Sequence, residues 1–565
     1  MSDAGTRSTA EPPFSDLETK AWIALLALSL LLHLVQLGSH ALHHDESIHA
    51  WAALHLIQDG TYKYDPVYHG PIQYYAVGLV YKVAGLVTGG HGDSDFTARL
   101  APALGGIALS MMALLLRRRF GPGAAFAAGV LAAFSPNLLY YSRFCRDDIW
   151  SLLGTAGLFL WLDQYLARGR LRDLCFASLS ASVAFASKEN FYVLLALMVP
   201  SVAAAWAEPG RGLDVWNRLR RLIDWLEEHT VPLVGALLLF FCVSEVLYTF
   251  FLVHPESGNP VFEAISYWWG QHKMERVGGP KTFYLPRLLQ YEFAIVLPAL
   301  ALVATRWSRF TFAERFLTGW ALSSVAMYAY LGEKAGWLIV HQVLPFLPLA
   351  GAAWALLAEK GSRARLGGAA LAAASLLTAV TLTFVYPVLT PNSRKAESTI
   401  QVQTCPEMLG LVDEILAYGK VGEVPAAIVS GEAGWPMSWY VRKAPVNWQA
   451  PKGDLHPPIV LCDEGDADKQ AEILGPAYKR DRVPFRAWWI PDVSLAPLRP
   501  NFKQLLLYVF TRETWNRADG NNPVGSVWVT VFRRTGPAAA PPAPAQAPAA
   551  DAPPGQPPLD AKSAP

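Results

Sequence analysis

Long apolar runs recur along roughly the first 390 residues of the chain. Most are about 17 to 23 residues long, the length of helix that crosses the ~30 Å hydrocarbon core of a bilayer. The pattern predicts eleven transmembrane helices, near residues 21–39, 97–116, 122–140, 150–166, 173–187, 190–207, 231–253, 289–305, 314–331, 338–357 and 367–388.

Basic clusters between these runs predict the orientation, because Lys and Arg are enriched on the cytoplasmic side of a membrane. All of them fall on one side if the N-terminus is cytoplasmic. The odd number of crossings then places everything after residue 389 outside the cytoplasm. The clusters are Arg117 to Arg119, Arg168 with Arg170 and Arg172, Arg218 with Arg220 and Arg221, Arg306 with Arg309, and Lys360 with Arg363 and Arg365.

A twelfth apolar run, residues 71–89, tests this orientation. If it crossed the membrane, every later basic cluster would change sides. The run also contains Gln73, three tyrosines and Lys82. We therefore predict an interfacial or re-entrant segment inside a long first external loop, residues 40–96.

The C-terminal region has a different character, with charged and apolar residues mixed as in a soluble domain. After a cytoplasmic segment at 1–20 and a membrane domain at 21–389, residues 390–535 are predicted to form a small extracytoplasmic α/β domain. The Pro- and Ala-rich tail at 536–565 is predicted to be disordered. The expected elements are helices near 406–418 and 467–474 and strands near 426–430, 458–462 and 526–532.

Composition agrees with an integral, multi-pass protein of the cell (inner) membrane. The chain is 52% hydrophobic and 16% charged, with a mean hydropathy of +0.23. Its net charge of +1 gives no electrostatic reason to expect a nucleic-acid partner. The five cysteines lack the spacing of a zinc or redox motif, and Cys405 and Cys462 are either a disulfide or two separate thiols.

Four predicted external loops carry acids and bases that are costly to place beside lipid and therefore indicate a site. Asp45 and Glu46 directly follow the first apolar run. The other loops carry Arg143, Arg146, Asp147 and Asp148 in the second, then Ser187 to Asn190, and Gly332 to Trp337 ahead of His341.

These residue types suit transfer of a sugar from a polyprenyl-phosphate donor. A carboxylate can take the proton of an acceptor hydroxyl, and Arg or Lys can hold the departing phosphate. Each residue also has a structural interpretation. Asp45 and Glu46 fit a helix N-cap, the second-loop charges fit a local ion-pair network, Lys188 with Glu189 and Glu333 with Lys334 fit interfacial pairs, and His341 fits a hydrogen-bonded interior histidine.

Six of the thirteen histidines lie between His40 and His69, which suggests a metal. The predicted ligand set is His44, Asp45 and Asp147, with Asp148 as an alternative member. The ligand types leave Mg, Mn and Zn open as the divalent cation.

Together the loops resemble the GT-C glycosyltransferases. Asp-Glu after the first span, the interfacial segment, Arg99 to Leu104 and the acidic second loop are similar to the dolichyl-phosphate-mannose protein mannosyltransferases and aminoarabinose transferases. His69-Gly70-Pro71 stands where those relatives carry Lys-Pro-Pro. A nearer resemblance, to the flippase-activity-associated membrane proteins of archaeal N-glycosylation and their bacterial relatives, rests on Tyr64-Asp65-Pro66, Ser142-Arg143-Phe144, Arg146-Asp147-Asp148, Gly332-Glu333-Lys334 with Trp337 and His341, and Trp435-Pro436 with Trp439 to Arg442.

The resemblance implies an inverting hexosyl- or pentosyltransferase that uses a polyprenyl-phosphate sugar and an extracytoplasmic glycan, lipid or protein acceptor. It implies that Asp45 is the general base, supported by Glu46. The remaining site residues have two implied roles. Binding of the donor phosphate is assigned to Arg143, Arg146, Lys188 and Lys334, and orientation of the acceptor or a metal to Asp147, Asp148, His69 and His341. The alternative is a non-catalytic membrane factor that binds lipid-linked glycan and assists its flipping.

Overall fold

The computed structural model describes residues 13–60, 64–207, 214–255, 260–271, 281–449, 455–489, 498–514 and 524–536. The chain divides into two compact units. Unit 1 comprises Met1–Gly38, Ala52–Val385 and Val493–Asn501, and unit 2 comprises Ser39–Trp51, Tyr386–Asp492 and Phe502–Pro565. Residues 1–12 of the predicted cytoplasmic segment and residues 537–565 of the predicted tail lie outside the described residues.

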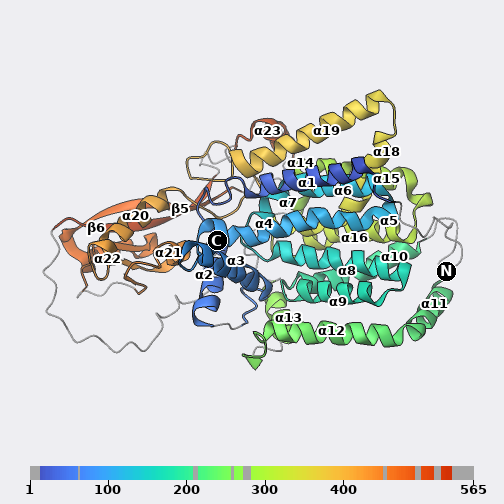
Figure 1. Cartoon of the computed structure of the whole chain (residues 1–565). Coiled ribbons are helices and arrows are strands. Elements are labelled where there is room, and N and C mark those ends of the chain that lie inside the picture. The colour runs from blue at the N-terminus through green and yellow to red at the C-terminus, as the bar shows by residue number, and fades with distance from the viewer. Residues whose placement is uncertain are drawn as a thin grey trace. The chain divides into compact units, whose positions relative to one another are not determined.

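Unit 1 is helical (Figure 1). Each of the eleven predicted apolar runs falls on a helix or a bent pair of helices. The helices are α1 (Asp16–Leu34), α2 (His44–Asp59, shared with unit 2), α3 (Ile72–Thr88), α4 (Asp95–Met112), α5 (Arg117–Phe120), α6 (Pro122–Phe134), α7 (Pro136–Ser142), α8 (Asp148–Arg168), α9 (Leu171–Phe185), α10 (Asn190–Trp206), α11 (Val215–Glu228), α12 (Thr230–Tyr248), α13 (Pro260–Gln271), α14 (Tyr284–Tyr291), α15 (Phe293–Arg306), α16 (Phe312–Tyr330), α17 (Ile339–Val343), α18 (Phe346–Ala358) and α19 (Ser362–Val380).

Four of these helical segments among the described residues are long and apolar enough to cross a membrane singly, or up to seven if each bent pair counts as one span. The bent pairs are α6 with α7 (59°), α14 with α15 (99°) and the segment containing α17 with α18 (57°). The helices of the remaining predicted runs are shorter or less apolar. The predicted interfacial run forms a continuous helix, α3.

Small residues let the helices of unit 1 approach closely. A Cβ atom at Gly154 of α8 would lie 2.4 Å from the backbone nitrogen of Ala184 on α9. One at Gly351 of α18 would lie 2.4 Å from the carbonyl oxygen of Ala124 on α6. Close packing of this kind is how helices associate where lipid removes the hydrophobic driving force between them.

Glu292 holds two of the bent pairs together. It lies at the break between α14 and α15 and is 1% exposed. Its carboxylate accepts hydrogen bonds from the Ser135 hydroxyl (2.8 Å) and from the backbone and side-chain nitrogens of Asn137 (2.9 and 2.8 Å). Because Ser135 and Asn137 mark the start of α7, one buried acid satisfies donors that the break between α6 and α7 exposes.

The connection before α3 is held against the connection between α9 and α10. The Gly70 N–H donates to the Ser187 carbonyl (3.1 Å), and a Cβ at Gly70 would lie 2.1 Å from the Ala186 carbonyl oxygen. His69, in a left-handed conformation (φ 66°), directs its Nδ1 to Glu189 at 2.6 Å. The His69-Gly70-Pro71 motif thus requires glycine for a close backbone approach.

A buried ion pair results from this approach. His69 stacks on Trp268 of α13, with ring centroids 5.4 Å apart, and Glu189 also accepts a hydrogen bond from the Tyr64 hydroxyl (3.0 Å). Burial opposes protonation of His69, but the Glu189 carboxylate outweighs it and raises the histidine pKa. Lys188 and Asp147 are the other charged groups that act on His69, and they act in opposite directions.

Unit 2 is an α/β domain with a six-stranded mixed sheet in the order β1-β5-β6-β4-β2-β3. β2 is parallel to β3 and β4, and the remaining pairs are antiparallel. The elements are β1 (Gln403–Thr404), α20 (Glu407–Lys420), β2 (Ala427–Val429), α21 (Gly434–Tyr440), β3 (Val446–Asn447), β4 (Ile459–Asp463), α22 (Ala467–Leu474), β5 (Tyr478–Trp488), α23 (Leu498–Thr511, shared with unit 1) and β6 (Gly525–Arg534).

The sheet is covered on both faces. Ala427 and Val429 of β2 pack in the core that contains α20, whereas Ile428 packs in a second core with Ala467 and Leu474 of α22. This alternation follows from the two-residue period of a strand. The five elements that the sequence predicts in this region are present, whereas β1, α21, β3, β5 and α23 are unpredicted. Cys405 and Cys462 are free buried thiols.

Removing the carboxylate at Glu292 is expected to destabilise unit 1. In Glu292→Ala the buried donors of Ser135 and Asn137 lose their acceptor, which costs about 1–3 kcal/mol for each unsatisfied group. Thermal unfolding in detergent measures the loss. Glu314→Ala, at the exposed capping box of α16, is the matched control and should cost less. Equal losses in the two variants would contradict this role.

The His69–Glu189 pair predicts a pH dependence of stability. Because the folded-state pKa of His69 is raised above its ordinary value near 6.5, the pair stabilises fully below that pH and its contribution is lost as the pH rises through the folded pKa. The unfolding temperature should therefore fall with rising pH, and less steeply in His69→Gln. Asp147, whose pKa is also raised, contributes the part of this pH dependence that remains in His69→Gln. An unchanged slope in His69→Gln would contradict the pair.

Candidate functional site

A buried charge cluster in unit 1 is built around Asp148, the first residue of α8. Its Oδ1 lies 2.6 Å from Lys188 Nζ and 3.1 Å from His341 Nε2, and its Oδ2 lies 3.4 Å from Arg146 Nε. All four side chains are nearly fully buried. The structure therefore brings together two residues predicted in the second loop, one predicted in the third loop, and His341 from the apolar run that follows the fourth loop.

The cluster carries an excess of fixed positive charge. Lys188 lies in the connection between α9 and α10. The Arg146 guanidinium lies over the Trp337 ring, 4.0 Å from its centroid. Two cations thus face the single carboxylate of Asp148. At the low effective dielectric of a buried site, such an excess attracts an anion more strongly than it would in water.

Asp147 adjusts this charge. It is fully buried at the N-terminus of α8, and burial raises its pKa to about 7, although His69, Lys188 and Arg146 all act to lower it. Burial therefore favours the protonated form of Asp147 more than it would for an exposed aspartate.

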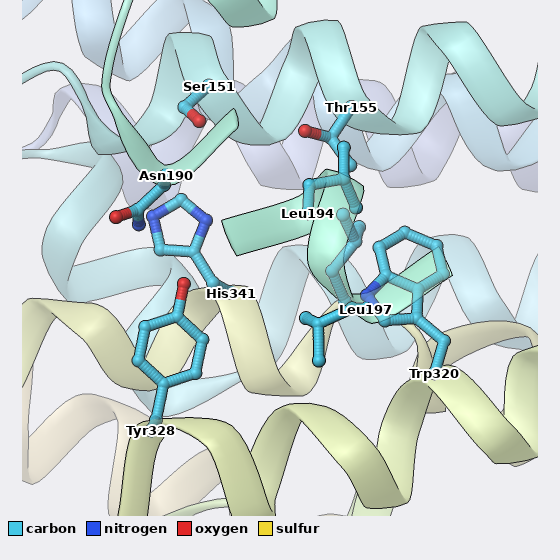
Figure 2. Close-up of a pocket in the computed structure, with 9 residues that line it drawn as sticks. Ser151, Thr155, Asn190, Leu194, Leu197, Trp320, Tyr328 and His341 are labelled. Carbon is cyan, nitrogen blue, oxygen red and sulfur yellow. The ribbon is translucent and has the colours of Figure 1, made fainter. Parts of the chain in front are cut away.

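A cavity of about 20 Å³ adjoins the cluster at His341. Figure 2 shows Asn190 and Tyr328 close to the His341 imidazole, with Leu194, Leu197 and Trp320 further along. The buried Asn190 Nδ2 has no hydrogen-bond partner among the described residues. The cavity is large enough for a water molecule. Its full lining is Ser151, Thr155, Asn190, Leu194, Leu197, Trp320, Tyr328, His341 and Leu344.

Most of these lining residues are absent from the sequence prediction. Ser151 and Thr155 are four residues apart at the start of α8, so they share one face of that helix. This spacing of two hydroxyls inside an apolar run is a usable signal. Tyr328 and Trp320 lie within another apolar run, where the sequence pattern alone gives no such signal.

Arg143 and Lys334 are both predicted to bind donor phosphate. In the structure their side chains donate hydrogen bonds to backbone carbonyls near the C-terminal ends of helices. Arg143 Nη1 donates to the carbonyls of Leu32 (2.7 Å) and His33 (2.8 Å) near the end of α1. Lys334 Nζ donates to the carbonyls of Tyr328 and Ala329 (both 3.2 Å) and of Leu331. These bonds give both cations a structural function at carbonyls that a helix C-terminus leaves unsatisfied.

Asp45 and Glu46 lie in unit 2, and the structure separates their environments. Glu46 is fully buried and accepts a hydrogen bond from the His43 N–H (2.9 Å), which caps the start of α2. Asp45 is partly exposed, and its N–H donates to His43 Nδ1 (3.0 Å). The helix-cap alternative therefore applies to Glu46, while Asp45 stays partly exposed as a residue.

Within unit 2, the segment that carries Asp45 is held in place by residues from the C-terminal half of the chain. His43 Nε2 donates to the Gln401 carbonyl (2.8 Å), and the Leu42 N–H donates to the Tyr440 hydroxyl (2.7 Å). Trp51 packs edge-on against Trp435, with ring centroids 6.1 Å apart. Trp435 and Tyr440 belong to the motif that carries the family resemblance, so within unit 2 this motif supports the Asp45 segment.

A metal site is not apparent in the described part of the chain, where no three or more His, Cys, Asp or Glu residues are grouped to hold an ion. His44, one of the predicted ligands, has its Nδ1 3.0 Å from the Arg486 guanidinium, which also pairs with Glu432. A cation next to His44 would lie beside that positive charge. A divalent cation stays a prediction, and no step proposed below uses one.

Comparisons with known proteins agree with the fold. A family model for dolichyl-phosphate-mannose-protein mannosyltransferase matches residues 68–248. ArnT from Cupriavidus metallidurans bound to undecaprenyl phosphate is similar at a TM-score of 0.55 and 14% identity, covering 92% of this chain and 100% of that chain. The apo oligosaccharyltransferase of Archaeoglobus fulgidus is similar at 0.52 and 11%, covering 92% and 88%. No curated protein matches the chain.

The two solved structures share the fold of this chain along most of its length, and at these identities they show the fold alone. The predicted fold class, a helical membrane domain of GT-C type followed by a small α/β domain, is confirmed. The family model matches part of the membrane domain, and together with the two solved structures it makes this chain similar in fold to glycosyltransferases of GT-C type.

Proposed function

We propose that the protein transfers a sugar from a polyprenyl-phosphate donor to an extracytoplasmic acceptor. The observation that supports it most directly is the pair of buried cations, Lys188 and Arg146, oriented by Asp148. A buried excess of positive charge suits a phosphate. The similar ArnT structure contains undecaprenyl phosphate, the class of donor phosphate that we assign here.

In the proposed reaction an acceptor hydroxyl attacks the anomeric carbon of the donor sugar. The new carbon–oxygen bond forms as the bond from that carbon to the phosphate oxygen breaks. The leaving phosphate takes the bonding electrons, and Lys188 with Arg146 stabilises its added charge. The hydroxyl proton passes to a carboxylate. Because the acceptor attacks from the side opposite the leaving phosphate in a single displacement, the configuration at the anomeric carbon is inverted.

Asp45 is the proposed base. Its partial exposure at the start of α2 leaves it accessible to an acceptor, whereas Glu46 is committed to the helix cap. Asp148 is less suited to proton abstraction because Lys188, Arg146 and His341 stabilise its anion and so weaken it as a base. We therefore assign Asp148 to the orientation of Lys188.

Asp45→Asn should abolish transfer and leave donor binding intact. Loss of a general base costs about 10²- to 10⁴-fold in rate. The measurement is release of labelled sugar from polyprenyl-phosphate donors by the purified protein, with donor binding measured separately. Glu46→Gln is the matched control, since its amide oxygen still accepts the His43 N–H. If Asp45→Asn turns over donor like the wild type, Asp45 is not the base. If the wild type binds donor but releases no sugar with any acceptor, a role in assisting glycan flipping replaces transfer.

Replacing Lys188 should weaken binding of undecaprenyl phosphate. Loss of a charge-assisted hydrogen bond of about 1.5–3 kcal/mol corresponds to roughly a 10- to 100-fold increase in Kd. Lys188→Met combined with Asp148→Asn removes the lysine together with the carboxylate it pairs with, and leaves Arg146 as the remaining cation of the cluster. Lys334→Met is the contrasting variant, expected to lower the unfolding temperature with less effect on Kd. An unchanged Kd in the folded double variant would contradict the proposed phosphate site.

A further inference from the structure

The helix α11 (Val215–Glu228) has a continuous apolar face that the protein leaves uncovered. No side chain of this helix is buried. At 100° per residue, five apolar positions fall on one side of the helix. They are Val215, Leu219, Leu222, Ile223 and Leu226. Leu222, Ile223 and Leu226 are 42%, 52% and 42% exposed, so this face has no partner within the described residues of the chain that would account for its composition.

Aromatic and basic residues border this face. Trp216, 82% exposed, lies along one edge and Trp225 along the other. By the same rule Arg218 lies beside Trp225 on the second edge, Arg220 lies beyond Trp216 on the first, and Arg221 lies beyond Trp225 toward the polar side. The acids Asp224 and Glu228 lie on the opposite, polar side, and Glu227 follows Arg220 two turns later. Tryptophan and arginine at both borders of an apolar face are typical of a helix that lies in a membrane interface.

The next helix, α12, is apolar and mostly exposed, as expected for a helix that contacts lipid. α12 is 19 residues long with a mean hydropathy of 2.2, and only 6% of it is buried within the protein. Its outward surface therefore requires lipid. Figure 1 shows α11 leaving the end of α12 at an angle, where the chain becomes too polar to continue across a bilayer.

The joint between the two helices is fixed by aromatic contacts. The His229 ring stacks on Trp225, with centroids 4.5 Å apart, and meets Tyr165 of α8 edge-on at 6.1 Å. His229 Nδ1 also lies 2.9 Å from the Trp225 carbonyl. The base of α11 is thus anchored to the bundle at the end where α12 begins.

We propose that α11 lies on the membrane surface, with its apolar face among the upper acyl chains and with Arg220 and Arg221 on the phosphates of phospholipid headgroups. The site is separate from the Asp148 cluster and does not depend on the proposed reaction. A lipid interface is the occupant that matches the combination of a lipid-exposed neighbour, flanking tryptophans and phosphate-binding arginines.

The experiment uses the full chain with its exposed cysteines, Cys175 and Cys242, replaced by serine. A fluorophore is attached at Ile223→Cys on the apolar face or at Asp224→Cys on the polar face, its matched control. The protein is reconstituted in vesicles of phosphatidylcholine and phosphatidylglycerol. Aqueous iodide should quench the probe at position 223 several-fold less than the probe at 224, and nitroxide-labelled lipid should quench 223 more.

Equal iodide quenching at positions 223 and 224 would overturn the proposal. Shielding of position 223 from both iodide and labelled lipid would also overturn it, because a protein partner or a second copy would then cover the face. The phosphate contacts are tested in Arg220→Gln/Arg221→Gln, where iodide quenching at 223 should rise. Glu228→Gln is the control and should leave it unchanged. If the double variant matches this control, the assignment of the arginines to phosphate is wrong.

Discussion

The organisation of unit 1 depends on how the buried carboxylate of Asp148 is neutralised. An isolated charge in such a place would cost several kcal/mol, so the fold must supply partners with good geometry. Lys188, Arg146 and His341 come from three different parts of the chain. Satisfying Asp148 therefore fixes the second loop, the connection from α9 to α10, and α17 with respect to one another.

The same requirement connects structure to chemistry. A lysine and an arginine held by one carboxylate are pre-organised, so an anion that reaches them does not have to order flexible side chains. The raised pKa of Asp147 adds a group that can release its negative charge by taking a proton. In the proposed function, structural neutralisation and phosphate binding use the same buried residues.

Much of this arrangement could be predicted from the sequence, and the failures have physical causes. Apolar runs located the helices, but they did not show that three of the runs are bent pairs of helices, such as the pair at Glu292, because hydropathy carries no information on helix direction. Period-two and period-3.6 patterns located β2, β4, β6, α20 and α22. β5 escaped because its Lys479 to Arg482 stretch is exposed and charged, which hides the alternation of a strand. The cations Arg143 and Lys334 looked equivalent to Lys188 because sequence does not show which carbonyls a side chain reaches.

The position of phosphate in the protein tests the central claim most directly. A cryo-EM structure of the full chain with undecaprenyl phosphate would show it in the wild-type protein. The account predicts phosphate oxygens within about 3 Å of Lys188 Nζ and the Arg146 guanidinium, the distance of a charge-assisted hydrogen bond. Phosphate bound elsewhere, with the Lys188–Asp148–Arg146 cluster unchanged and empty of ligand, would contradict it.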